Sequence, residues 1–210
     1  HIIFYKMVKY SQNLEEQHIL NYFGDFKGNL LDIGANDGKT FSNSLKLIEL
    51  GWKATLVEPS PKAFNKLSEL HFGNKNVTCI NTAIGTKNGT MILHESSHHN
   101  KDQKDIALLS SLKESETERW KKSGVKFNQC EVNVSTYEKV FETSTFDFIT
   151  IDAEGYDLEI LRQIDLTDTT LLCIEWNTND QAKGQILEYT IKFGMNKIIY
   201  VSGENLLIGR

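Results

Sequence analysis

The sequence has no apolar run approaching the ~20 residues that a membrane-spanning helix needs. It also has no signal-peptide pattern, no internal repeat, and no stretch rich in proline, glycine and serine that would indicate a linker. We therefore expect no membrane partner and one domain over residues 1–210, with a helical N-terminal segment over 1–28 and an insertion over 85–134. The chain begins with His1 rather than Met, which leaves its native start open.

Cysteine is scarce, and positive charge is not in excess. Cys79, Cys130 and Cys173 are the only cysteines, and no two of them form a C-x-x-C pair. This scatter fits a reducing compartment, and hence a cytoplasmic protein, better than a disulfide framework. The net charge of −5 gives no general reason to expect nucleic acid or an anionic membrane as a partner.

Two nucleotide-binding signatures are also missing. No G-x-x-x-x-G-K-[S/T] motif is present, which argues against a P-loop site. The turn with Gly34 and Gly38 has Asn36 where a dinucleotide-binding G-x-G-x-x-G motif needs its central glycine. Asp37 beside it would repel a pyrophosphate, whereas it would not repel an amino group or a sulfonium. Asp32, at the end of the preceding strand, likewise suits an ammonium better than a phosphate.

What the sequence does contain is an alternation of short buried strands and amphipathic helices. Strands are predicted at 30–33, 52–58, 77–80, 146–151 and 171–176. Helices are predicted at 14–23, 40–50, 61–72, 157–164 and 181–193. Such alternation indicates an α/β fold, a doubly wound three-layer sandwich with a mostly parallel sheet. Near the end of the chain, 197–201 and 206–208 flank a turn signature that predicts an antiparallel hairpin.

The middle of the chain interrupts this alternation. A hairpin turn is predicted at 85–89, before a short strand. The polar stretch 95–105 is expected to be a surface loop, since little of it can be buried. Residues 125–134 alternate weakly and are predicted as a further strand.

Acids end several of the predicted strands. Asp32, Glu58 and Asp152 each close an apolar run. The carboxyl ends of parallel strands meet at the edge where open α/β sheets bind ligands. Glu58 follows Gly38 by 20 residues, a spacing that suits an acid accepting hydrogen bonds from ribose hydroxyls. Its other interpretation is a surface acid that simply precedes a helix.

Several stretches resemble the FkbM-type methyltransferases, a class I group that uses S-adenosylmethionine. The stretches are Leu31-Asp32-Ile33-Gly34-Ala35-Asn36-Asp37-Gly38, Val57-Glu58-Pro59-Ser60, Asn81-Thr82-Ala83-Ile84-Gly85 and Ile151-Asp152-Ala153-Glu154-Gly155-Tyr156-Asp157. The resemblance covers nearly the whole chain. It implies a Rossmann-like sheet of seven strands that ends in the hairpin, with S-adenosylmethionine as the cofactor. One departure is Asp157, where the family often has Glu.

The resemblance also implies which residues bind this cofactor. Its methionine end would be lined by residues of the first strand and turn: Asp32, Gly34, Asn36 and Gly38. Its ribose would be held at the end of the second strand: Glu58, with Pro59 and Ser60 beside it. Its adenine would lie near the residues after the third strand: Asn81, Thr82 and Ala83. Asp152 would lie beside the methionine or the transferring methyl group.

Methyl transfer displaces a leaving group at an activated carbon, so the main task of the protein is to position the nucleophile. A hydroxyl acceptor also needs a group that takes its proton. The candidate catalytic residues are acids at the carboxyl ends of predicted strands: Asp152, Glu154 and Glu175. These acids suit a divalent ion as well, but the pattern does not favour one, and no metal is expected. Glu154 has a second interpretation, as an acid that stabilises the start of the next helix.

The sequence therefore predicts a methyltransferase that acts on a small acceptor, by resemblance a hydroxyl group of a sugar or secondary metabolite. Two alternatives remain open. A Rossmann-type oxidoreductase that binds NAD(P) is disfavoured by Asn36 and Asp37. A non-catalytic cofactor-binding or scaffold domain is disfavoured by the three acids Asp32, Glu58 and Asp152. No nucleic-acid partner is expected, and the oligomeric state is left open.

Overall fold

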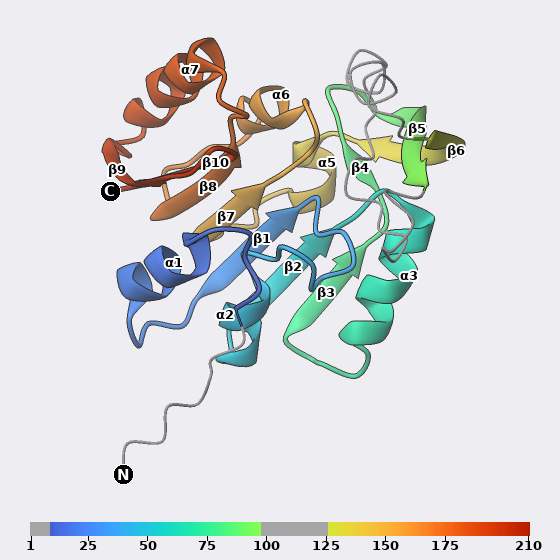
Figure 1. The fold of residues 1–210 in the computed structure, drawn as a ribbon, viewed down its shortest axis with the longest axis horizontal. Coiled ribbons are helices and arrows are strands. Elements are labelled where there is room, and N and C mark those ends of the chain that lie inside the picture. The colour runs from blue at the N-terminus through green and yellow to red at the C-terminus, as the bar shows by residue number, and fades with distance from the viewer. Residues whose placement is uncertain (1–8, 98–125) are drawn as a thin grey trace.

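The computed structural model describes residues 9–97 and 126–210, and its main sheet crosses the middle of the molecule (Figure 1). Its seven strands lie in the order β3-β2-β1-β7-β8-β10-β9. They are β1 (Asn29–Ile33), β2 (Lys53–Val57), β3 (Val77–Ile80), β7 (Phe148–Ile151), β8 (Leu171–Glu175), β9 (Lys197–Val201) and β10 (Asn205–Gly209). The first five are parallel, and β10 is antiparallel to both β8 and β9. The predicted mostly parallel sheet with a terminal antiparallel hairpin is confirmed.

Helices cover both faces of this sheet. One face packs against α1 (Glu15–Phe23), α2 (Leu45–Glu49) and α3 (Pro61–Leu70). The other packs against α5 (Tyr137–Phe141), α6 (Asp157–Leu161) and α7 (Asp180–Ile191). Successive side chains of a strand point to opposite faces, so in β1 Leu30 joins the first core and Leu31 joins the second. This arrangement is the three-layer sandwich that the alternation predicts.

Side-chain caps set the starts of two helices that border the sheet. The hydroxyl oxygen of Ser60 accepts a hydrogen bond from the N–H of Ala63 at 3.2 Å, and Pro61 occupies the first position of α3. Proline is tolerated there because the first helical N–H has no partner within the helix. The side chain of Asn179 caps α7 in the same way.

The helix predicted over 40–50 is wrong in its first half, because α2 begins only at Leu45. The carboxylate of Asp37 accepts hydrogen bonds from the N–H groups of Lys39 and Thr40 and so closes a turn. Phe41 then has a φ of 56°, a left-handed conformation that cannot continue a right-handed helix. Residues 40–44 are therefore a loop. The short helix α5 was not predicted.

The hairpin predicted around 85–89 is also wrong. β4 (Ala83–Ile84), β5 (Gly89–Ser97) and β6 (Lys126–Ser135) form a second sheet in the order β4-β6-β5. β6 lies between the two strands that the turn connects, parallel to β4 and antiparallel to β5. Within the predicted surface loop 95–105, residues 95–97 belong to β5 and the others lie outside the described residues.

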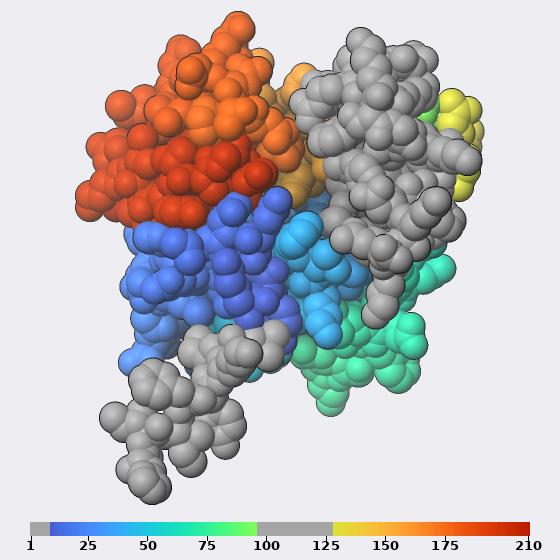
Figure 2. Space-filling model, in the orientation of Figure 1, coloured from blue at the N-terminus to red at the C-terminus, as the bar shows by residue number. Residues whose placement is uncertain are grey.

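Residues 9–28 of the N-terminal segment lie against the C-terminal hairpin, seen as blue beside red in Figure 2. The buried carboxylate of Glu15 accepts hydrogen bonds from the Ser202 hydroxyl at 2.8 Å and the Asn205 amide at 3.3 Å. Asn13 donates to Glu204 at 2.8 Å. Burial opposes ionisation of Glu15, but hydrogen bonds from backbone N–H groups, the Ser202 hydroxyl and the Asn13 side chain outweigh it and lower its pKa.

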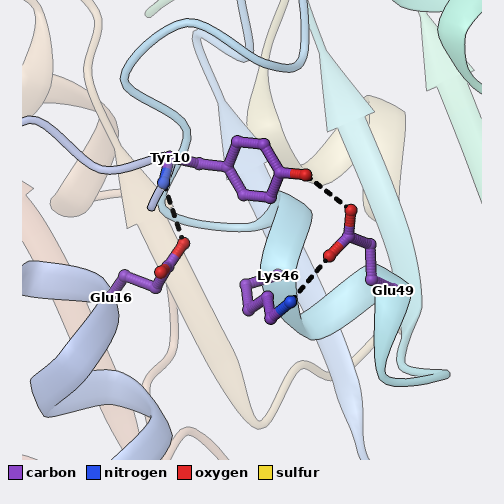
Figure 3. A network of polar contacts seen from close by, with 4 residues as sticks. All are labelled: Tyr10, Glu16, Lys46 and Glu49. Carbon is purple, nitrogen blue, oxygen red and sulfur yellow. Dashed lines mark hydrogen bonds and ion pairs between the residues drawn. The ribbon is translucent and has the colours of Figure 1, made fainter. Parts of the chain in front are cut away.

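A second set of contacts ties the same segment to α2 (Figure 3). The Tyr10 hydroxyl donates to Glu49 at 2.7 Å, and the Tyr10 N–H donates to Glu16 at 3.1 Å. Glu49 also pairs with Lys46 at 3.0 Å. The two sets of contacts fix residues 10–13 beside the carboxyl edge of the main sheet.

All three cysteines are free thiols. Cys173 is buried in β8, and Cys79 and Cys130 are partly buried. Stability therefore comes from packing and hydrogen bonding rather than from covalent cross-links. Within the described ranges, no helix has the length and apolar character needed to cross a bilayer.

Candidate functional site

A cavity of about 380 Å³ lies at the carboxyl edge of β1, β2, β7 and β8. Its size lies in the range of small-molecule sites. No Lys, Arg or His is found among the described residues that line it, whereas its acids are Asp32, Glu58, Asp152, Glu154, Glu175 and Glu204. Such a wall favours cationic or hydroxyl-bearing ligands over phosphates.

Most of the predicted site residues line this cavity: Asp32, Gly34, Asn36, Glu58, Pro59, Thr82, Ala83, Asp152, Glu154 and Glu175. Gly38, Ser60 and Asn81 do not. Ser60 caps α3, and the Asn81 amide donates to the carbonyl oxygens of Glu58 and Pro59 at 2.8 and 3.1 Å. A Cβ at Gly38 would lie 2.6 Å from Leu67 in α3. In this structure these three residues support the cavity from behind its wall.

Gly34 allows the ends of β1 and β7 to approach closely. Its φ is 88°, and a Cβ at this position would lie 1.7 Å from the carbonyl oxygen of Asp152. No other residue fits without moving one of the two strands. The close approach brings Asp32 and Asp152, from different strands, onto the same cavity wall.

Asp32 is buried, and its carboxylate accepts a hydrogen bond from the Ser44 hydroxyl at 2.6 Å. Burial raises the pKa of Asp32 to about 6, although the Ser44 hydrogen bond opposes the shift. The group therefore remains mainly ionised at neutral pH and places negative charge beside the turn. This charge is what an ammonium group requires.

Glu58 links two turns through both of its carboxylate oxygens. Oε2 accepts the N–H of Asn36 at 2.8 Å, and Oε1 accepts the N–H of Ser60 at 2.7 Å. Burial raises its pKa to about 7; the two backbone hydrogen bonds oppose the shift, and the charges of Asp32 and Glu95 add to it. Each oxygen has a further lone pair, so the carboxylate can accept ligand hydroxyls as well.

Asp37 does not line the cavity, although the sequence suggested that its charge would repel a pyrophosphate. Its carboxylate accepts hydrogen bonds from the N–H of Lys39 and from the N–H and hydroxyl of Thr40, at 2.7–2.9 Å. Burial opposes ionisation, but these hydrogen bonds outweigh it and lower the pKa of Asp37. The acid shapes the turn, and other carboxylates give the cavity its negative charge.

Within the described part of the chain, two buried side-chain amide atoms on the cavity wall have no hydrogen-bond partner: Asn36 Nδ2 and Asn43 Oδ1. A buried polar atom left unpaired costs about 1–3 kcal/mol, which a ligand can recover. One atom is a donor and the other an acceptor, as the carboxylate and ammonium of an amino acid require. The pair therefore fits the methionine end of S-adenosylmethionine. Asn43 was not predicted, because it fell inside the expected helix 40–50.

Asp152, Glu154 and Glu175 meet at another part of the wall. One carboxylate oxygen from each lies within 4.8 Å of the other two. Asp152 faces the cavity, but the surrounding protein limits solvation of its carboxylate and raises its pKa to about 7. The negative charges of Asp157, Asp32 and Glu58 add to this shift. Burial, with the same kind of charge repulsion, raises the pKa of Glu175 well above its usual value. Asp152 is therefore suited to exchange a proton near neutral pH.

The position of Glu154 is set by the loop that carries it. The Asp157 carboxylate accepts the N–H of Ala153 at 2.8 Å and the N–H of Gly155 at 3.0 Å. Glu154 lies between them with a φ of 46°. Glu154 precedes α6 without belonging to it, and the acids in the first turn of that helix are Asp157 and Glu159.

Part of the cavity wall comes from segments far apart in the chain. Gln12 belongs to the N-terminal segment, Phe41 to the loop before α2, and Glu204 and Asn205 to the C-terminal hairpin. A β-bridge between Ser11 and Phe41 joins two of these segments. None of the four lining residues was predicted, because the tertiary fold alone brings them together.

The methyltransferase FkbM domain model matches residues 32–195. No curated protein matches the chain. A solved structure of precorrin-6y C5,15-methyltransferase from Geobacter metallireducens GS-15 is 13% identical, with a TM-score of 0.51, over 97% of this chain and 89% of that one. The T. thermophilus 16S rRNA N2 methyltransferase RsmC, in complex with AdoMet and guanosine, is 13% identical with a TM-score of 0.51, over 99% and 45% of the chains. At such identities the likeness concerns the fold.

Proposed function

Because the chain belongs to the FkbM methyltransferase domain family, we propose that it transfers a methyl group from S-adenosylmethionine to a small acceptor. The main support is the cavity itself. An unpaired buried donor and an unpaired buried acceptor, on Asn36 and Asn43, share its wall with the carboxylates of Asp32 and Glu58. Residues 1–210 are proposed to act as one domain, since both ends of the chain contribute to this wall.

In this proposal Asn36 donates to the carboxylate of the methionine moiety, and Asn43 accepts from its ammonium. Asp32 adds negative charge beside that ammonium. Glu58 accepts the ribose hydroxyls through the lone pairs that its two backbone contacts leave available. Thr82 and Ala83 line the same cavity and are assigned to the adenine end.

When bound, S-adenosylmethionine supplies a methyl carbon on a sulfonium, which the acceptor attacks while the C–S bond breaks and its electrons remain on sulfur. The cavity residues position the acceptor for this displacement. For a hydroxyl acceptor, the acids Asp152, Glu154 and Glu175 are the proposed proton acceptors. A pKa near 7, as Asp152 has, suits a general base that works at neutral pH.

The proposed acceptor is a hydroxyl of a sugar or another small metabolite. The described lining has no basic side chain to pair with phosphates, and nucleic-acid binding depends on such pairing. Gln12, Glu204 and Asn205 add donors and acceptors for hydroxyl groups to the cavity wall. These three residues lie outside residues 32–195, the part of the chain that the family model matches. We therefore assign the choice of acceptor largely to the N-terminal and C-terminal segments of this chain.

A thermal-shift titration tests the cofactor first. S-adenosylhomocysteine should raise the melting temperature in a concentration-dependent way, and NAD⁺ and NADP⁺ should not. Turnover is then measured as S-adenosylhomocysteine released from S-adenosylmethionine with a panel of sugars and polyhydroxylated metabolites, with an RNA oligonucleotide as the competing acceptor class. Stabilisation by NAD⁺ alone would overturn the proposed cofactor. If S-adenosylhomocysteine is released only when RNA is present, the proposal of a small-molecule acceptor is wrong.

A further inference from the structure

The three carboxylates of Asp152, Glu154 and Glu175 form the closest grouping of metal-ligating side chains in the described part of the chain. Each offers one oxygen, and these oxygens lie within 4.8 Å of one another. No Lys, Arg or His lines the cavity in that part of the chain. Like charges so close repel one another strongly unless a cation lies between them.

A second observation concerns a single atom of this group. Glu175 is deeply enclosed by protein, and its Oε2 is shielded from solvent without a hydrogen-bond partner in the described residues. An ionised carboxylate oxygen is an acceptor only, so in the charged form of Glu175 this oxygen lacks a donor or a cation. The neighbouring acids Asp152 and Glu154 are themselves acceptors when ionised.

We propose that Asp152, Glu154 and Glu175 bind one hard divalent cation of the Mg²⁺ or Mn²⁺ class. All-oxygen donor sets select this class over Zn²⁺ and other softer metals. A set of three protein oxygens leaves further coordination positions for water or for an oxygen of the acceptor. The sequence did not favour this site, because it shows where the acids lie along the chain but not that their oxygens converge.

The local fold preorganises the proposed ligands. Glu175 ends β8, and Asp152 directly follows the neighbouring strand β7. Asp157 holds the backbone on both sides of Glu154 through two hydrogen bonds. Fixed ligands of this kind lower the cost of ordering the site when the ion binds.

The role of the ion rests on the proposed function, but its binding does not. Beside a methyl donor, a divalent cation would hold the acceptor oxygen and lower the pKa of its hydroxyl. The three acids would then act through the ion, and the proton would leave to solvent or to a free carboxylate.

The test measures Mn²⁺ binding to the chelator-treated protein by electron paramagnetic resonance, with Mg²⁺ as the competitor. Wild-type protein should bind one Mn²⁺, which Mg²⁺ displaces. Glu175→Gln and Glu154→Gln should each weaken Mn²⁺ binding at least tenfold. The control Glu188→Gln, at an exposed site on α7, should bind as the wild type does. Thermal shift with S-adenosylhomocysteine, without metal, reports in the same variants whether the fold and cofactor site persist.

Weakened Mn²⁺ binding in both cluster variants, with the S-adenosylhomocysteine shift retained, supports the metal site. No Mn²⁺ bound to wild-type protein overturns it, and so does equal binding by all four proteins. In either case, bound protons rather than a metal ion reduce the negative charge of the three acids. A protein that binds Mn²⁺ at this site but never responds to S-adenosylhomocysteine contradicts the proposed function and leaves the metal site standing.

Discussion

Glu58 serves the fold and the proposed ligand with the same two oxygens. The sequence suggested an acid for ribose hydroxyls, and the structure adds hydrogen bonds from the N–H groups of Asn36 and Ser60. Those contacts explain why the end of β2 and the turn after β1 keep a fixed distance. They also mean that a substitution at Glu58 must be judged by both stability and binding.

Glu58→Gln should weaken S-adenosylhomocysteine binding by about 1.5–3 kcal/mol, the range for hydrogen bonds to a charged group. Glutamine keeps the size of the side chain but has only one acceptor oxygen. Titration calorimetry gives the affinity, and urea unfolding shows whether the variant is folded. Glu69→Gln, at an exposed position on α3, is the control. An unchanged affinity in a folded Glu58→Gln protein would remove this residue from the ligand site.

Asn43 separates binding from stability more cleanly. Its Oδ1 is buried without a partner, so removing it relieves part of the cost of an unpaired atom in the ligand-free protein. Asn43→Ala should therefore change the free energy of unfolding by less than about 1 kcal/mol, yet weaken S-adenosylhomocysteine binding at least about tenfold. Calorimetry and urea unfolding measure the two effects. The opposite result, a large loss of stability with normal binding, would assign Asn43 to packing alone.

Gly34 illustrates what a residue pattern leaves out. The pattern marked it as a ligand-binding turn, and it does line the cavity. The structure adds that a Cβ here would meet the carbonyl oxygen of Asp152 at 1.7 Å. A substitution at Gly34 would thus disturb the packing of β1 on β7, and a loss of binding would not show that the glycine touches the cofactor.

Elements with strong local signals were predicted best. Ser60 and Pro61 mark the start of α3, and the predicted ends of β1, β7 and β8 are either exact or wrong by no more than two residues. The loop at 40–44 was missed because its apolar spacing resembles a helix, whereas its shape depends on the side-chain hydrogen bonds of Asp37. The order β4-β6-β5 was missed because strand neighbours far apart in sequence leave no local signal.

Glu15 is one of the residues that join the N-terminal segment to the terminal hairpin. Glu15→Gln should lower the free energy of unfolding by about 1–3 kcal/mol at pH 7, because the charged hydrogen bonds to Ser202 and Asn205 weaken. The folded state lowers the pKa of Glu15, so this stabilisation is present above the unfolded pKa of 4.5 and is lost as pH falls through the folded value. Urea unfolding measures the difference in the free energy of unfolding between the wild type and Glu15→Gln, and this difference should be smaller at pH 4 than at pH 7. If the difference is the same at both pH values, the charge of Glu15 is not its cause.

At the scale of the whole molecule, the concentration of acids at one edge makes stability depend on pH. The folded state raises the pKa of Asp32 to about 6 and that of Glu58 to about 7, so it retains protons that the unfolded chain releases. Stability must therefore fall as pH rises between the unfolded and folded pKa values. Glu58 alone contributes on the order of 3 kcal/mol to this change.

Ligand-free protein should accordingly be more stable at pH 5 than at pH 8 in urea unfolding, and Glu58→Gln should make its stability depend less on pH.

Binding of S-adenosylmethionine should show the reverse trend and tighten as pH rises through 6 to 7, because its ammonium and sulfonium are attracted to ionised carboxylates. Calorimetry across this range tests the second trend. Affinity that stays constant from pH 5 to pH 8 would contradict the assignment of these acids to a cationic ligand.

The overall architecture was predictable, because alternating buried strands and helices restrict the topology to a few solutions. The inner wall of the cavity was predictable for the same reason, since acids at strand ends meet at one edge. The contributions of Gln12, Phe41 and Glu204 to the wall were not, because these residues come from three segments that only the folded chain brings together.

The most direct measurement is a crystal structure of the protein with S-adenosylhomocysteine. The ligand should occupy the cavity at the ends of β1, β2 and β7, with its ribose hydroxyls on Glu58 and its amino-acid group between Asn36 and Asn43. A complex in which this ligand lies elsewhere, or in which those two amides bond only to protein, would contradict the account of the site.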